Sequence, residues 1–241
     1  METFVGVDFA AQAKDTWAAI GTVRSKGRFK ITEIRGNISD EDMVAIAGAG
    51  HQVIAIDAPF GWPDGFVSFV EKYHMGRTPR PVERIDFRFR MTDKDIHDRF
   101  RKWPLSVSTD RLGIVAHRLT SLLSRLTDCD VPPFWKNGRT TTIIEVYPAA
   151  TLLALGLSTK GYKAEGKVRG SMLRKLDAAG LEIPLDLAEL CIASDDALDA
   201  AVCALTAHLY SLGETVGHPA GDMLIRQEGW IFAPRKRPIV S

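Results

Sequence analysis

Carboxylate side chains end three short apolar runs of this chain, at Asp8, Asp57 and Glu145. Runs of β-branched and small apolar residues are typical of strands that are buried on both faces of a sheet. Ligands of an open α/β sheet bind at the carboxyl ends of its strands, so we expect the three acids to face one crevice. Converging carboxylates repel one another unless a positive charge lies between them, and a divalent cation usually supplies it.

A fourth acidic group, made of Asp195, Asp196 and Asp199, opens an apolar helix predicted from residue 195 to about 211. Ser194 is a good N-cap, and acids in a first turn stabilise the helix dipole, so capping alone can explain Asp195 and Asp196. Asp199 fits capping less well, because at about 100° per residue it flanks the apolar stripe of this helix. A carboxylate beside a buried face needs a partner, which favours a ligand role.

The elements that would position these acids follow from hydrophobic periodicity and from end signals. Three strands, a helix and a fourth strand come first, and the predicted order is an antiparallel meander whose first strand pairs in parallel with the fourth. The predicted strands cover residues 3–9, 17–23, 28–34, 52–57 and 141–147. The predicted helices cover residues 40–48, 64–74, 93–101, 110–127, 148–155, 165–179, 186–192 and 195–211.

The chain of 241 residues is long enough for one large core, and we predict a single domain over residues 1–241. The motif Ala58-Pro59-Phe60-Gly61-Trp62-Pro63 breaks the regular pattern after the fourth strand. An irregular, arginine-rich stretch follows, and residues 60–140 are predicted to form a cap-like insertion between the fourth and fifth strands.

The overall charge argues neither for nor against a polyanionic partner, because the formal net charge is only +1. The distribution of charge says more: residues 77–102 hold nine Lys or Arg against five Asp or Glu, and residues 160–175 hold six against one. Such clusters suit phosphate-binding surfaces beside a metal site, although solvated helix faces give the same pattern. An odd number of cysteines, the absence of a signal peptide and the absence of a long apolar run predict a cytoplasmic protein that has no membrane partner.

Several motifs of this sequence together resemble a known family. They are Gly6-Val7-Asp8, Ile56-Asp57-Ala58-Pro59-Phe60-Gly61-Trp62-Pro63, Arg90-Met91-Thr92-Asp93, Glu145-Val146-Tyr147-Pro148-Ala149 and Asp195-Asp196-Ala197-Leu198-Asp199-Ala200. The set spans nearly the full length and resembles the domain of unknown function 429 family, often described as predicted nucleases of the RNase H-like (RuvC-like) fold. The implied fold class is α/β, with a mixed five-stranded sheet flanked by helices.

The resemblance implies hydrolysis of phosphodiester bonds in nucleic acid at two Mg²⁺ or Mn²⁺ ions, ~3.5–4 Å apart. Asp8 would bridge the ions, Asp57 and Asp199 would each hold one, and Asp196 or Asp195 would complete a coordination shell. Junction cleavage by such folds implies a homodimer as well. Glu145 is an extra acid beyond the usual set, and it would serve as a general base or would support the metal ligands.

We also predict that the Arg90/Thr92/Asp93 motif and its neighbour Arg88 bind the substrate, although their individual roles are less clearly indicated than those of the metal ligands. We assign Arg90 to phosphate clamping, because a guanidinium binds phosphate with a bidentate fork.

Two other functions remain open at this point. Actin-like ATPases and phosphotransferases share this fold, but they need glycine-rich phosphate hairpins, and neither Asp8 nor Asp57 is followed by one. A catalytically inactive nucleic-acid-binding module is the third hypothesis, because fold alone does not fix function.

Overall fold

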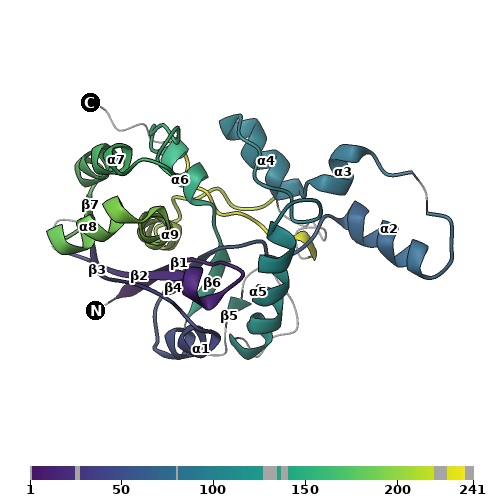
Figure 1. Ribbon diagram of the computed structural model, residues 1–241, viewed down its shortest axis with the longest axis horizontal. Coiled ribbons are helices and arrows are strands. Elements are labelled where there is room, and N and C mark those ends of the chain that lie inside the picture. Colours follow the sequence, from purple (N-terminus) through teal and green to yellow (C-terminus); the bar gives the residue numbers. More distant parts are fainter. Residues whose placement is uncertain are drawn as a thin grey trace.

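The computed structural model describes residues 2–24, 28–79, 81–126, 135–136, 141–219 and 227–236, with the backbone alone for residues 135–136. The centre of the molecule is a mixed sheet (Figure 1). Its first three strands, β1 (Thr3–Asp8), β2 (Trp17–Val23) and β3 (Phe29–Gly36), form an antiparallel meander. β4 (Val53–Asp57) pairs in parallel with β1, and β6 (Thr142–Glu145) pairs in parallel with β4. The predicted meander and the predicted parallel return are confirmed.

The predicted number of strands is wrong. Within the described residues the sheet has seven strands in the order β5-β6-β4-β1-β2-β3-β7. The additional strands are β5 (Trp135–Lys136), antiparallel to β6, and β7 (Leu181–Glu182), parallel to β3. Each has only two residues and lies at one edge of the sheet, and two residues are too few for a periodic pattern to appear in the sequence.

Helices cover both faces of the sheet and agree with the predicted ones to within two residues at their boundaries. The described helices are α1 (Asp40–Gly48), α2 (Asp64–His74), α3 (Arg84–Arg88), α4 (Met91–Phe100), α5 (Leu112–Leu126), α6 (Pro148–Ala154), α7 (Gly166–Ala178), α8 (Leu185–Ala193) and α9 (Asp195–Ser211), with a short 3₁₀ turn, η1 (Ala13–Asp15). Helix α3 and the turn η1 were not predicted from the sequence. Local signals explain several boundaries: Ser39 and Asp42 form a capping box at α1, and Pro148 begins α6.

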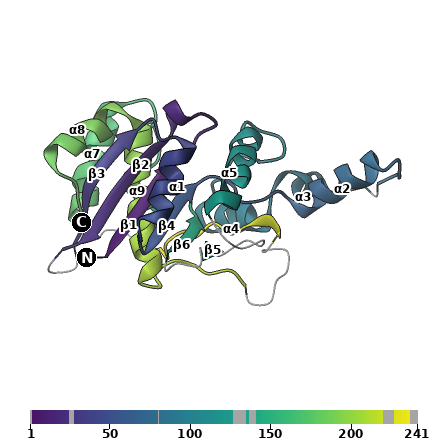
Figure 2. The same ribbon diagram turned by 90° about the horizontal axis from the view of Figure 1, so that it is seen from below.

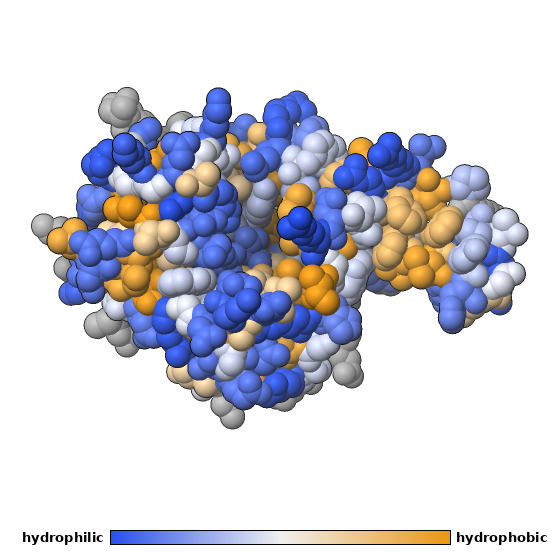
Figure 3. Space-filling view, viewed as in Figure 1, coloured by the Kyte–Doolittle hydropathy of each residue, from blue (hydrophilic) through white to orange (hydrophobic). Residues whose placement is uncertain are grey.

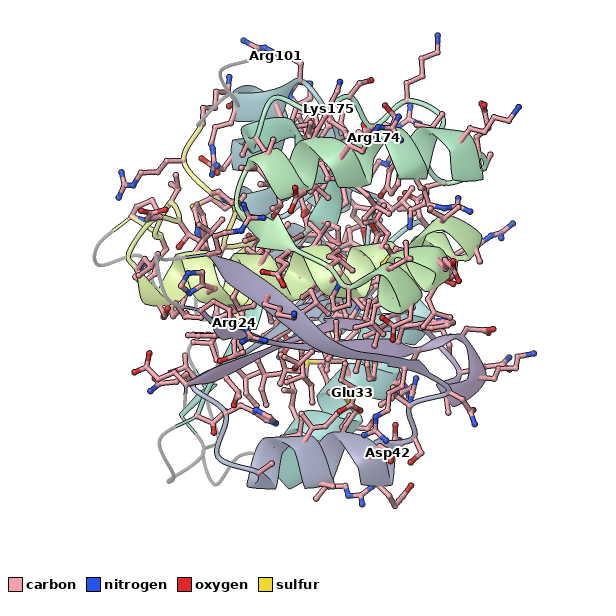
Figure 4. All side chains as sticks on the ribbon, turned by 90° about the vertical axis from the view of Figure 1, so that its left-hand side faces the viewer. Arg24, Glu33, Asp42, Arg101, Arg174 and Lys175 are labelled. Carbon is pink, nitrogen blue, oxygen red and sulfur yellow. The ribbon has the colours of Figure 1, made fainter. Side chains whose placement is uncertain are left out.

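Alternation along the strands divides the core into two halves. Phe4, Val53 and Ile144 point to the face that α9 covers, whereas Val5 and Ile54 point to the face that α1 and α5 cover. Figure 4 looks across these layers and shows α7 outside α9 on one side of the sheet and α1 on the other. Buried Cys191 and Cys203 are free thiols on helices, as predicted, whereas Cys129 lies outside the described residues.

The described part of the predicted insertion divides in two. Helices α2 and α3 contain no buried residue and project from the body of the molecule, as two perpendicular views show (Figures 1 and 2). Helix α5 instead packs under the sheet and contributes Leu119, Leu122 and Leu123 to the core. No helix in the described ranges is both long and apolar enough to span a membrane.

Candidate functional site

Two predicted site residues lie side by side because their strands pair in parallel. Asp8 is the last residue of β1, Asp57 is the last residue of β4, and the two are direct partners in the register of the pair. Side chains at matching positions of neighbouring strands point to the same face of a sheet. The strand register therefore holds these two carboxylates together.

Helix α9 brings a third acid to the same place. It packs directly on β1, because a Cβ atom added at Gly6 would lie only 2.0 Å from the backbone nitrogen of Ala204. The lack of a side chain at Gly6 thus allows a close approach that other residues would prevent. Asp199 lies on the buried side of α9 and is 1% exposed.

Asp195 and Asp196 lie in the first turn of α9, where the Oγ of Ser194 accepts a hydrogen bond from the backbone of Ala197, so the predicted N-cap is confirmed. Beyond the effect of burial, the charge of Asp196 raises the pKa of Asp8, so the helix start lies near the strand-end carboxylates.

The loop before α7 supplies two residues that the sequence analysis missed. The hydroxyl of Tyr162 donates to Asp199, at 3.1 Å from Oδ1, and the ammonium of Lys163 pairs with Oδ2 of the same residue. Lys163 also lies 3.3 Å from Oδ2 of Asp195. Buried Arg169 fixes the loop by donating to the carbonyl oxygen of Tyr162 at 2.7 Å. The basic cluster of residues 160–175 was visible in the sequence, but no spacing singled out Lys163.

Burial and mutual repulsion shift the ionisation of these acids. Burial raises the pKa of Asp8 well above its ordinary value, and the charges of Asp57 and Asp199 raise it further. Burial and Asp199 raise the pKa of Asp57 in the same way. Burial raises the pKa of Asp199 to about 6, although Lys163 and Tyr162 act in the opposite direction. Negative charge here is thus only partly compensated by the protein itself.

These groups face a cavity of about 320 Å³. Asp8, Asp57, Asp199 and Lys163 line it, and Asp195 and Asp196 are not among its lining residues. The surface is hollowed between the helices over the sheet and the base of the projecting insertion (Figure 3). The cavity lies at the carboxyl ends of parallel strands, as predicted for a ligand site in an open α/β sheet.

Glu145 lines the same cavity, but it is already paired with Arg90. The guanidinium of Arg90 donates from Nη2 to Oε1 at 2.7 Å and from Nη1 to Oε2 at 3.0 Å. The backbone nitrogen of Phe60 donates to Oε2 as well, at 3.1 Å. Burial raises the pKa of Glu145, and Arg90 opposes that rise. Because both carboxylate oxygens of Glu145 already accept hydrogen bonds, this residue connects the insertion to the carboxyl end of β6.

Of the predicted substrate-binding residues, Arg90, Thr92 and Asp93 are buried and Arg88 lies apart from them. Arg90 also binds Asp93, at 3.0 Å, and both side chains are buried, so the Arg90 fork is engaged by carboxylates. Thr92 is fully buried, and its Oγ1 accepts a hydrogen bond from the backbone of Ile231. Arg88 lies away from the cavity lining, with its Nε 3.3 Å from Thr109 Oγ1.

The sequence analysis also missed Glu228, whose carboxylate accepts hydrogen bonds from the backbone of Asp64 and Met91. It thereby holds the C-terminal segment against the starts of α2 and α4.

The carboxylates of the site have the right chemistry to bind a divalent cation, but their present arrangement does not form a metal-binding geometry. Among residues the structure describes, no three His, Cys, Asp or Glu side chains stand in a geometry that holds a metal ion. Lys163 provides the positive charge beside Asp199 instead. Carboxylate oxygens are nevertheless the ligands that Mg²⁺ and Mn²⁺ prefer, and Asp8, Asp57 and Asp199 supply them from three elements. A cation would require these side chains to rotate toward one another.

Comparison with protein-family models settles where this chain belongs. A family described as protein of unknown function (DUF429) matches residues 6–223, which include every candidate site residue named above except Glu228. The chain belongs to the DUF429 family. No curated protein and no solved structure matches the chain. Because the family is one of unknown function, the reaction has to be argued from the site.

Proposed function

We propose that this DUF429 protein is a divalent-metal-dependent nuclease that hydrolyses phosphodiester bonds. One observation carries the proposal: Asp8, Asp57 and Asp199 come from three separate elements and face one cavity, and among the described residues the one basic side chain paired with any of them is Lys163, on Asp199. Ligands that compensate such a site carry positive charge, and a metal ion that also binds a phosphate is the usual one.

The architecture supports the same proposal. An antiparallel meander, a fourth strand parallel to the first, and a late helix packed on the first strand form the arrangement expected of an RNase H-like fold. The acids lie at the ends of β1 and β4 and on α9. These are the positions at which the family resemblance places metal ligands.

In the proposed reaction, Asp8, Asp57 and Asp199 would hold Mg²⁺ or Mn²⁺, with Asp196 or Asp195 adding a ligand. Such ions activate water and stabilise the leaving oxygen. Tyr162 keeps Asp199 oriented through its hydrogen bond, and Lys163 is close enough to Asp199 to contact a bound phosphate as well. The oxygen of water forms a bond to phosphorus, the bond from phosphorus to the leaving oxygen breaks, and that oxygen takes up a proton.

The test is cleavage of a substrate panel in Mg²⁺ or Mn²⁺ by the wild type, by Asp8→Asn and by Asp98→Asn. The panel contains single-stranded and duplex DNA, RNA, an RNA–DNA hybrid and a four-way junction. Asp98→Asn is the matched control, because its side chain is 75% exposed and lies on α4, away from the cavity lining. Cleavage by the wild type and the control, lost in Asp8→Asn, supports the proposal.

Absence of cleavage by a folded wild type contradicts the proposal. ATP turnover that disappears in Asp8→Asn would replace it with the actin-like phosphotransferase hypothesis. Nucleic-acid binding that is indifferent to metal and to Asp57→Asn would favour the inactive binding module. The homodimer and the cytoplasmic location expected from the sequence stay predictions.

A further inference from the structure

The cavity lining contains two chemically different groups of residues. One group is the carboxylates with Lys163. The other, called here the second wall, comes from the segment between α4 and α5 and consists of Lys102, Pro104 and Leu105, together with Leu112 at the start of α5. The metal chemistry proposed above uses none of the four residues of the second wall.

Leu105 is the most informative residue of this wall. It lines the cavity and yet is 60% exposed, so an apolar side chain reaches solvent in the same cavity that the acids line. Pro104 beside it is buried and holds the segment against the body of the molecule. An apolar surface next to a charged one suits a ligand that has both an apolar face and a phosphate, and a nucleotide is such a ligand.

The size of the cavity restricts that ligand. About 320 Å³ lies at the lower end of the range for ligand pockets, roughly 300–1,000 Å³. A space of this size has room for one nucleotide and not for a stretch of duplex. Proteins that act within such a pocket take one nucleotide out of its stack or bind an unpaired strand.

We propose that the cavity binds one unpaired nucleotide, with its base or sugar against Pro104, Leu105 and Leu112 and its phosphate toward the carboxylate side. The substrate class is therefore single-stranded nucleic acid or an unpaired strand end. Tyr147 and Thr159 also line the cavity, and in the proposed complex their hydroxyl groups would bind polar edges of the nucleotide. As a statement about a substrate, the inference rests on the proposed nuclease function.

The first experiment compares cleavage of one oligonucleotide alone, in a blunt duplex and in a duplex with an unpaired end. We expect the blunt duplex to be cut at least roughly tenfold less efficiently, because unpairing a base consumes binding energy and about 1.4 kcal/mol corresponds to tenfold. Cleavage within the duplex at the rate of the single strand would overturn the inference and leave the nuclease proposal intact.

The second experiment measures binding of thymidine 5′-monophosphate by calorimetry, in Ca²⁺ to prevent turnover, for the wild type, Leu105→Asn and Leu185→Asn. Leu185 is 79% exposed on α8 and is absent from the cavity lining, so it is the matched control. We expect roughly tenfold weaker binding for Leu105→Asn alone, the lower end of what loss of an apolar pocket contact causes. With a cleavable single strand, the same change is expected in KM, with kcat unchanged.

The two experiments separate the inference from the proposed function. If nothing is cut but the mononucleotide binds and Leu105→Asn weakens it, the nucleotide cavity stands and the nuclease proposal falls. If strands are cut while the mononucleotide fails to bind, or Leu105→Asn binds it as the wild type does, the cavity assignment is overturned.

Discussion

Replacing Arg90 with methionine tests whether this residue is structural or binds phosphate. Its guanidinium donates five hydrogen bonds: Nε and Nη2 to Asp93, Nη1 and Nη2 to Glu145, and Nη1 to the carbonyl oxygen of Glu228. The side chains of Arg90, Asp93 and Glu145 are 3%, 1% and 3% exposed. Arg90→Met therefore leaves two carboxylates buried without their cation.

Removing one partner from a buried ion pair lowers the free energy of unfolding by about 3–5 kcal/mol, since an uncompensated charge remains in the interior. We expect a loss of that size at neutral pH, which is a large fraction of the stability of an ordinary domain. The loss should shrink as the pH falls, because Glu145 can then take up a proton. Burial already raises the pKa of Glu145 while Arg90 is present.

Denaturant unfolding followed by circular dichroism measures this loss. Arg125→Met is the control, because Arg125 is 48% exposed on α5 and its distance to Glu41 is 3.4 Å, so its loss should change stability by about 0.5 kcal/mol or less. The combination Arg90→Met, Asp93→Asn and Glu145→Gln should recover a large part of the loss, since it removes the buried charges as well. An Arg90→Met protein as stable as the wild type that has lost nucleic-acid affinity would refute the reasoning and restore the phosphate clamp.

Three further predictions follow from other contacts. Gly6→Ala should lower the free energy of unfolding by about 1–3 kcal/mol or more in denaturant, because its Cβ would meet the backbone of α9. Burial lowers the pKa of His208 below 6.5, although Glu214 acts in the opposite direction. The folded state therefore binds fewer protons than the unfolded state, and the stability should fall as the pH drops through 6.5. In thermal unfolding, His208→Phe should make this loss of stability smaller. Lys163→Met should lower the free energy of unfolding by about 1 kcal/mol in the absence of metal, a value reduced because the Lys163 side chain is 54% exposed. Addition of Mg²⁺ should restore most of the lost stability.

Much of the fold could be predicted because its strands and helices carry strong local patterns. The β1 and β4 runs are apolar on both faces and end at acids, so their parallel pairing was enough to place Asp8 beside Asp57. Asp199 could be singled out because it flanks the apolar stripe of α9, and it is indeed buried there. In each case a periodic signal within one element determined the position of the side chain.

The remaining features depend on contacts between distant segments, which one sequence does not reveal. Lys163 lies in an irregular loop, and only the folded structure brings it to Asp199 on another element. The guanidinium of Arg90 has the same chemistry whether it meets a phosphate or a carboxylate, so its pairing with Glu145, 55 positions away, could not be inferred from its type. Glu228 joins α2 and α4 from still further along the chain.

Two clusters of buried acids in this molecule differ in how far the protein compensates their negative charge. Both place carboxylates in the interior, where an unpaired charge is unfavourable. Around Glu145 the protein supplies a matched cation, and all the oxygens of Asp93 and Glu145 have donors from Arg90. Around Asp8, Asp57 and Asp199 the described part of the chain supplies Lys163 alone as a paired cation, and the pKa values of all three acids are raised. We therefore expect the first cluster to be structural, and we expect the second, which is short of positive charge, to take a ligand that brings that charge with it.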